Sequence, residues 1–345
     1  MRFGQPSKTL SDGIGALFPF HDTEMVDAAS GQRDGLLARA QQLGCVPKVI
    51  TINTSTEYWG GDRGSGGQSS LLHTDPSGSR DIEPPDTSRV YLVAGAQHLP
   101  SVWPVDDFTH LGIHCAQMIC ALDHRPLQRA LLMALDRWVA QGQEPPPSRI
   151  PRLADGTAIT PETGLEELAM IPGLVPPAHL PELRRLDFGF AEAGVPTRLP
   201  PLRGEPYPWF VSAVDSDGNE ISGIRHPDIA VPLATYVGFN VRHASSGAPG
   251  ELVPAAGAMY PFASTADRRR AEDRRPSIAE RYRDRETYLQ RIMEAARSLV
   301  VDGLLLTEDV GPIVEEAGIK YDAFVGTVVA SATSAGRDHR SRSVE

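Results

Sequence analysis

The chain lacks the features that mark several common classes of protein. Its three cysteines, Cys45, Cys115 and Cys120, are odd in number and too few for a disulfide framework, so free thiols are expected. No run of about eighteen apolar residues exists, which excludes a spanning helix, and residues 1–7 lack the apolar core of a signal peptide. The net charge of −11 argues against nucleic acid or an anionic membrane as the main partner. We therefore expect an acidic, soluble protein without a targeting signal in this sequence, and we expect it to be cytoplasmic.

Length and proline content predict two parts. A chain of 345 residues can bury a large core and normally makes two domains, or one large domain with extensions. The prolines at 145–147 end the first part, so residues 1–147 are predicted to form one domain. Residues 148–325 are predicted to be a proline-rich mixed extension with hairpins and C-terminal helices, and residues 326–345 a disordered tail.

Two apolar segments predict neighbouring strands of a parallel sheet. Lys48–Asn53 and Arg89–Ala94 are rich in Val, Ile and Leu and carry little charge, as strands buried on both faces do. Apolar residues recur at helical spacing over Arg125–Gln141, with Pro126 in the first turn and Gly142 at the end. This predicts a helix that covers the sheet, and the fold class is therefore α/β.

Two polar side chains follow the predicted strands directly. Glu57 comes just after the first strand and His98 just after the second. Parallel strands present their ligands at their carboxyl ends, so both side chains are expected at one edge of the sheet. An acid after one strand and a histidine after a later one is the chain order of an α/β-hydrolase triad, in which the carboxylate orients the imidazole. We predict Glu57 and His98 as catalytic acid and base; the alternative is two ordinary polar loop residues.

The nucleophile that such a pair serves is not evident. A serine hydrolase of this type needs Gly-x-Ser-x-Gly on a strained strand-to-helix turn, and the chain contains no such pattern. Ser65 lies among glycines with no strand before it and no helix after it, and Ser245 and Ser246 fail in the same way. These serines are interpreted as loop residues.

Two further polar groups give weaker alternatives. His73 is the runner-up histidine, although a solvated hairpin position explains it better. Asp215–Asn219 resembles the start of a calcium loop, but His226 stands at the twelfth position, where glutamate is required, and a hairpin turn is a sufficient explanation.

A zinc site is the third alternative. His110 and His114 have the i, i+4 spacing of a helical zinc pair, but no glutamate lies between them and Gly112 disfavours a helix. The potential ligands that follow them are Cys115, Cys120 and His124. A polar loop at the rim of the site explains the cluster better, so neither a metal nor a cofactor is predicted.

Local signals predict several smaller elements. Residues 1–33 show no sustained period and are expected to be surface loop. Asp34 is expected to cap a short helix over Gly35–Gln42, and Ser70–Asp75 to form a small strand.

The second half carries similar signals. Trp209–Val214 and Ile221–Ile224 predict a hairpin. Ser277, with glutamate three residues later, predicts a capping box for a long helix. Thr307 is expected to cap a last short helix.

Several sequence blocks together resemble the large bacterial family called alpha/beta hydrolase domain-containing proteins. The resemblance extends from the first residues to about Tyr321. The blocks are Arg2–Ser7, Asp34–Arg39, Asn53–Trp59, Leu72–Asp75, Ala94–His98, Arg125–Leu132, Pro145–Ser148, Arg152–Gly156 and Ile229–Tyr236.

The resemblance implies an α/β-hydrolase fold and hydrolysis of esters by a serine-type triad. Glu57 matches the acid of the Ser-x-Glu-Tyr-Trp block and His98 the histidine of the Gly-x-Gln-His block. In the family the nucleophile elbow lies upstream of the block that here starts at Arg2. The chain is therefore expected to be the C-terminal portion of such a hydrolase, inactive or very weak by itself, with a small ester as substrate of the full-length form.

A non-catalytic protein is the rival interpretation. A parallel sheet that lacks its early strands exposes an edge, which invites pairing with another chain. The sequence therefore leaves open a remnant or assembly partner that needs a second chain to complete its sheet. Oligomerisation through the exposed edge follows from this interpretation.

Overall fold

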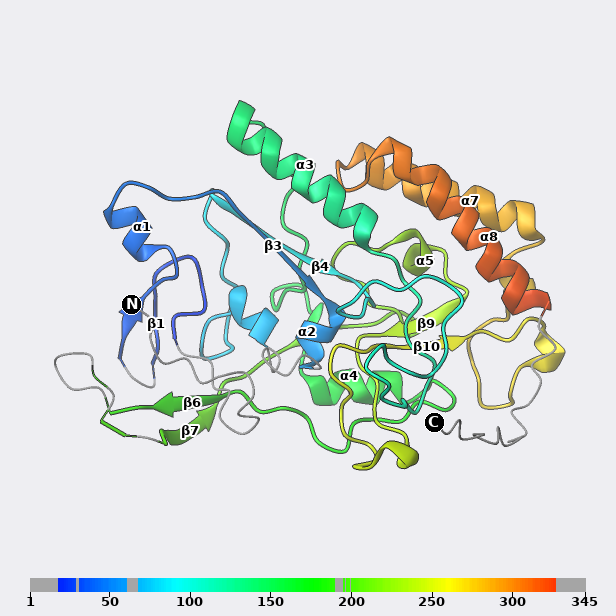
Figure 1. Cartoon of the computed structure of the whole chain (residues 1–345), viewed down its shortest axis with the longest axis horizontal. Helices are drawn as coiled ribbons and strands as arrows, with labels where there is room; N and C mark the ends of the chain where they lie inside the picture. The colour runs from blue at the N-terminus through cyan, green and yellow to red at the C-terminus, as the bar shows by residue number, and fades with distance from the viewer. Residues whose placement is uncertain are drawn as a thin grey trace, which may run out of the picture.

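The computed structural model describes residues 18–28, 31–60, 68–189, 195, 197–198 and 200–326 (Figure 1). Ser65, the first 17 residues of the predicted N-terminal loop and the predicted tail beyond residue 326 lie outside these ranges.

Short strands and helices of very different length alternate along the described chain. The strands are β1 (Met25–Val26), β2 (Arg33–Asp34), β3 (Val49–Thr54), β4 (Ser88–Val93), β5 (Ala158–Ile159), β6 (Arg184–Asp187), β7 (Leu202–Pro206), β8 (Val211–Ser212), β9 (Ala234–Val237) and β10 (Ala258–Pro261). The α-helices are α1 (Ala38–Gln42), α2 (Ser55–Trp59), α3 (Arg125–Gln141), α4 (Pro161–Leu168), α5 (Pro227–Ala230), α6 (Ile278–Arg281), α7 (Arg285–Val301) and α8 (Val310–Gly326). The 3-10 helices are η1 (Gln68–Leu72), η2 (Ala244–Ser246), η3 (Ala266–Arg268) and η4 (Thr307–Asp309).

The parallel pair of β3 and β4 lies at the centre of the molecule (Figure 1). Val49 is opposite Ser88 and Thr54 opposite Val93, so the two strands end level with each other. On its other side β4 makes backbone hydrogen bonds through Leu92. The Leu92 N–H donates to the carbonyl of Arg149 at 2.9 Å, and the Ile224 N–H donates to the carbonyl of Leu92 at 2.7 Å. The predicted α/β class is confirmed.

The helix predicted over Arg125–Gln141 is confirmed as α3. Pro126 stands in its first turn, and Gly142 ends it in the left-handed conformation at φ 72°. Its buried face includes Leu127 and Leu131, and α3 packs against β3. Segments that are far apart in the sequence meet in this core, because side chains of α3, β4 and α7 belong to one buried cluster.

Helices α7 and α8 pack side by side and close one side of the molecule (Figure 1). Lys320 of α8 is buried and donates hydrogen bonds to Asp228 at 2.7 Å and to the carbonyl of Ala121 at 2.9 Å. A buried ammonium needs such partners, since leaving one unpaired costs several kcal/mol, on the order of 3. The Lys320–Asp228 pair therefore fixes α8 to α5.

Two predicted N-terminal elements differ from the structure. The short helix exists and ends at Gln42 as predicted, but α1 begins at Ala38 rather than Gly35, with Leu37 as its N-cap residue. Asp34 does not cap it, because Asp34 pairs with Met25 in the β1–β2 ladder. Ser70–Asp75 is not a strand: it overlaps a 3-10 helix, and only Thr74 makes a β-bridge, with Asp81.

The second half also departs from the prediction. The Ser277 capping box exists, but it begins the four-residue α6, and the long helix α7 is capped by Asp284, whose side chain accepts from the Thr287 N–H at 2.8 Å. Thr307 lies in a 3-10 turn that leads into α8, a helix of 17 residues rather than a short one.

The predicted hairpin is half correct. Val214 and Glu220 face each other across the turn, as expected. However, β8 pairs with β5, and Ile224 pairs with Val93 of β4. The predicted division at residue 147 stays a prediction.

Two compositional expectations concern cysteines and membrane spans. The free thiols are confirmed, with Cys45 exposed and Cys115 and Cys120 buried. In the described ranges, no helix has both the length and the apolarity to cross a membrane.

Candidate active site

Glu57 and His98 lie beyond the carboxyl ends of β3 and β4. Strand β3 passes directly into α2, with Thr54 as the N-cap residue (Figure 1). Strand β4 ends at Val93, and Gly95, at φ 64°, turns the chain so that His98 returns toward α2. A backbone hydrogen bond of 3.3 Å from Thr56 N–H to the carbonyl of Ala96 joins the two segments.

The two side chains are in direct contact. His98 Nδ1 is hydrogen-bonded to Glu57 Oε1. The second carboxylate oxygen, Oε2, accepts from the backbone N–H of Thr54 at 2.6 Å and from its hydroxyl at 2.5 Å. Both oxygens are therefore held, one by the cap of α2 and the other by the imidazole. The Glu57 side chain is 11% exposed and that of His98 45% exposed, so the ring reaches solvent while the acid does not.

These contacts set the ionisation of the acid. Burial by itself raises the pKa of Glu57, but the hydrogen bonds from His98 and Thr54 outweigh it and lower the pKa below its ordinary value of 4.5. Glu57 is thus an acceptor at neutral pH, so the Nδ1 atom of His98 carries the proton of this hydrogen bond. In the neutral ring the lone pair is then on Nε2, which is the atom that a general base uses.

A buried carboxyl group, Glu220, connects the two segments that carry the pair. Its Oε1 accepts from the Ser55 hydroxyl at 2.6 Å and its Oε2 from the Gly95 N–H at 2.8 Å. Ser55 opens the helix of Glu57, and Gly95 opens the turn before His98. Burial raises the pKa of Glu220 to about 7. Glu220 therefore sets the spacing of both strand ends.

Helix α2 is also held from its other side. The Thr56 hydroxyl donates to the carbonyl of Gly238 at 2.7 Å. Gly238 lies so close to α2 that an added Cβ would come within 2.0 Å of the Ser55 hydroxyl oxygen. Only glycine fits between β9 and the first residue of α2.

The loop of His98 is anchored by the buried Gln97. Its carbonyl oxygen accepts from the Gly257 N–H at 3.1 Å, and its amide donates to the Ser101 hydroxyl at 2.7 Å. The side chain beside His98 thus fixes the backbone that positions the imidazole.

The runner-up histidine has a different environment. His73 is buried, and its Nε2 is 2.9 Å from the hydroxyl of Tyr58 of α2. Burial lowers the pKa of His73 to about 3, so the ring stays neutral. It packs behind α2, and the solvated position that we expected is wrong.

The residues considered for a zinc or a calcium site have other partners in the structure. His114 bonds Asp107 and Ser245 instead of facing His110 along a helix. No group of three or more His, Cys, Asp or Glu side chains in the described part of the chain is arranged to hold a metal ion. Asp215 instead accepts from backbone N–H groups of its own turn, among them that of Asn219 at 3.0 Å.

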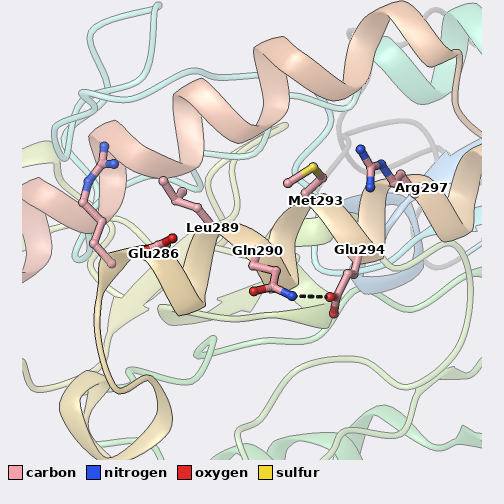
Figure 2. A pocket seen from close by; sticks show the side chains of 7 residues that line it. Glu286, Leu289, Gln290, Met293, Glu294 and Arg297 are labelled. Carbon is pink, nitrogen blue, oxygen red and sulfur yellow. Dashed lines mark hydrogen bonds between the residues drawn. The ribbon is translucent and has the colours of Figure 1, made fainter.

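A separate pocket lies along α7 (Figure 2). It encloses about 570 Å³ and is lined by α7 side chains such as Leu289, Met293 and Arg297. Gln290 and Glu294 at its wall bond each other at 3.0 Å. Its lining contains neither residue of the pair at the strand ends.

Sequence reasoning missed the residues that support the pair. Thr54 and Glu57 have the spacing of a capping box, so a signal for that contact was present. Glu220 and Gly238 carry no local signal, because their partners lie about 125 to 180 positions away in the chain.

A parallel strand pair with an acid–imidazole contact beyond its carboxyl ends defines an α/β protein of the hydrolase type. The family model described as "Alpha/beta hydrolase domain" matches residues 5–315, and the chain belongs to this family. No curated protein and no solved structure matches the chain.

Proposed function

We propose that Glu57 and His98 are the acid and base of a serine-type carboxylic-ester hydrolase whose nucleophilic serine lies outside this chain. The observation that carries the proposal is the contact of His98 Nδ1 with a buried, ionised Glu57 beyond two parallel strands. It fixes the tautomer in which Nε2 accepts a proton, as ester hydrolysis by a serine requires.

The pair alone supplies only part of the chemistry. In acyl transfer the serine oxygen attacks the carbonyl carbon while its proton passes to the imidazole, which then gives the proton to the leaving alcohol. Glu57 stabilises the imidazolium that forms between these two steps. The tetrahedral intermediate also needs hydrogen-bond donors for its oxyanion, and the proposal places these with the serine.

The test is an ester-hydrolysis assay of this chain, with wild type and His98→Ala compared for a burst of acyl-enzyme. We expect no burst that depends on His98. A burst, or a serine labelled by a fluorophosphonate, that His98→Ala abolishes would place the nucleophile in this chain and contradict the proposal.

The open edge of β3 favours assembly with another chain as a second candidate function. Among the described residues, β3 pairs with β4 on one side only. A parallel sheet is normally covered on both faces, and its strands are paired along their edges. A two-stranded parallel sheet with an unpaired edge is therefore suited to pairing with strands of another chain. In this second proposal the chain is an assembly partner, and the residues of the site have a structural role.

A further inference from the structure

A second chain of serine, imidazole and carboxylate lies in two surface loops remote in sequence. The loop at 106–116 and the loop at 241–246 lie side by side, because Ala116 N–H donates to the carbonyl of Val241 at 2.8 Å and His243 N–H to that of His114 at 3.0 Å. These backbone bonds hold side chains from both loops in one cluster.

The side-chain contacts run in one line. Asp107 Oδ2 is 3.0 Å from His114 Nε2, and His114 Nδ1 is 2.7 Å from the hydroxyl oxygen of Ser245. Ser245 is exposed, whereas His114 is about one quarter exposed, at 23% of its side chain. The nucleophile candidate thus reaches solvent while the base is partly covered.

The imidazole of His114 packs against two other rings. The ring of Phe108 stacks on it at a centroid distance of 4.4 Å and an interplanar angle of 8°. The ring of His243 lies at 4.1 Å from its centre. A side chain of the second loop also fixes the backbone of His114, since the Ser246 hydroxyl donates to the carbonyl of His114 at 2.9 Å.

The contacts determine which nitrogens accept protons. The Asp107 carboxylate oxygen accepts this hydrogen bond, so His114 Nε2 donates its proton and Nδ1 holds the lone pair that faces Ser245. His243 Nδ1, at 2.9 Å from the same hydroxyl, accepts the Ser245 N–H at 3.2 Å. The hydroxyl has a single proton and donates to one of these two nitrogens at a time; the shorter contact, 2.7 Å, is the one to His114 Nδ1.

We propose that Ser245 is a nucleophile for acyl transfer, with His114 as its general base and Asp107 as the residue that orients His114. The site is distinct from Glu57 and His98, and the imidazole is used in the opposite sense, with Nδ1 rather than Nε2 toward the serine.

A pocket beside Ser245 indicates the class of substrate. It is a shallow hollow of about 310 Å³ that is open to solvent, and it is lined by Phe108, Ile113 and Arg242 as well as by His114 and Ser245. This volume fits a small acyl group, for which Phe108 and Ile113 offer apolar contact. Arg242 also lines the hollow, and its guanidinium donates to the carbonyl of Ser246 at 3.3 Å, so a positive charge lies next to Ser245. The substrate class is therefore a short-chain ester.

The steps balance without a cofactor. The Ser245 oxygen forms a bond to the carbonyl carbon while its proton moves to His114 Nδ1. The carbon–oxygen bond to the alcohol breaks, and the leaving oxygen takes the proton from His114. Water then attacks the acyl-serine, gives a proton to His114, and the proton returns to Ser245 as the acid leaves.

The experiment is labelling of the full chain with a biotinylated alkyl fluorophosphonate, followed by peptide mapping and measurement of the labelling rate. We expect the label on Ser245 and its loss in Ser245→Ala. His114→Ala lowers the rate about 100-fold, as removal of a general base does, and added imidazole restores part of it. Asp107→Asn also lowers the rate, and Asp107→Glu recovers part of the loss.

Two matched controls come from the same surface. Ser77→Ala removes an exposed serine that bonds Asp75 without an imidazole, and His179→Ala removes a histidine that bonds Glu251 without a serine. Both variants are expected to leave the labelling rate unchanged. Labelling of Ser245 no faster than of Ser77, or a rate unaffected by His114→Ala, overturns the proposal.

Discussion

At the scale of single residues, the contact of Glu57 with His98 depends on how the carboxylate is shared. One oxygen completes the capping box of α2 and the other holds the imidazole. The same glutamate therefore completes the cap of α2 and selects the tautomer of His98.

Glu57→Gln is predicted to release the tautomer of His98. An amide oxygen can still accept from Thr54, so the cap is largely kept, but the anionic acceptor for Nδ1 is lost. Nitrogen-15 NMR of the imidazole should show Nδ1 protonated in the wild type and a mixture of tautomers in the variant. An unchanged Nδ1-protonated ring in the variant contradicts the proposed role.

Glu220→Gln is predicted to remove a pH dependence of stability. Glu220 has a folded pKa of about 7 against an ordinary value of 4.5, so its contribution is complete below pH 4.5 and is lost as pH rises to 7. A raised value of this size corresponds to a loss on the order of 3 kcal/mol. Denaturant unfolding measured from pH 4 to 8 should show that, as pH rises, the free energy of unfolding of the wild type falls relative to that of the variant.

Glu57 provides the comparison of opposite sign. Its pKa is lowered, so the stability that it contributes is present above pH 4.5 and is lost as pH falls. The Glu57→Gln variant should therefore be destabilised most, relative to the wild type, at pH 7 and least at acidic pH. The same trend with pH for both variants would contradict the assignment of the two carboxyl groups.

Glu57 and His98 could be selected from the sequence because both follow apolar strands, and parallel strands bring their ends together. Glu220 could not be selected from the sequence, because its role follows from its buried contacts with Ser55 and Gly95, which are far from it in the chain. A local pattern encodes the end of a strand but not the residue that a distant turn brings to it.

At the scale of elements, the position of α2 depends on its fit against β9. The Gly238→Ala variant is predicted to be destabilised by about 1 to 3 kcal/mol, since a Cβ there overlaps Ser55. Gly311→Ala is the matched control: nothing lies within 4 Å of its added Cβ, and alanine favours the helix by about 0.5 to 1 kcal/mol. Urea unfolding measures both, and equal effects would contradict the proposed fit.

The elements also show what local signals decide. Helix α3 follows from its pattern because its apolar stripe, first-turn proline and final glycine agree. The Ser277 box was identified correctly but assigned to the wrong helix, because Tyr282 is extended and Asp284 starts a new cap. The chain offers two start signals within eight residues, and packing determines how far each helix extends.

At the scale of the whole molecule, the open edge of β3 predicts association. Ile50 and Ile52 pack toward the core, so Thr51 between them points to the opposite face of the sheet. Thr51→Lys should weaken pairing at this edge, since charge discourages strand addition. Light scattering across a range of concentrations should show the wild type associating and the variant monomeric.

A control variant places the same charge elsewhere. Leu132 is 65% exposed on α3, so Leu132→Lys adds the same positive charge away from the edge and should leave association unchanged. A wild type that remains monomeric at every concentration contradicts completion of the sheet by a second copy.

The central claim is that Glu57 and His98 serve a serine supplied from outside this chain. The most direct measurement reads the DNA immediately upstream of the Met1 codon, adds the encoded segment to the chain and compares ester hydrolysis by the wild type and His98→Ala. The account predicts strands with a Gly-x-Ser-x-Gly turn, in frame or one frameshift away, and an active extended chain. It also predicts that His98→Ala lowers kcat/KM by about 10³ to 10⁴. Upstream DNA that encodes nothing related, or an active extended chain that is indifferent to His98→Ala, would contradict it.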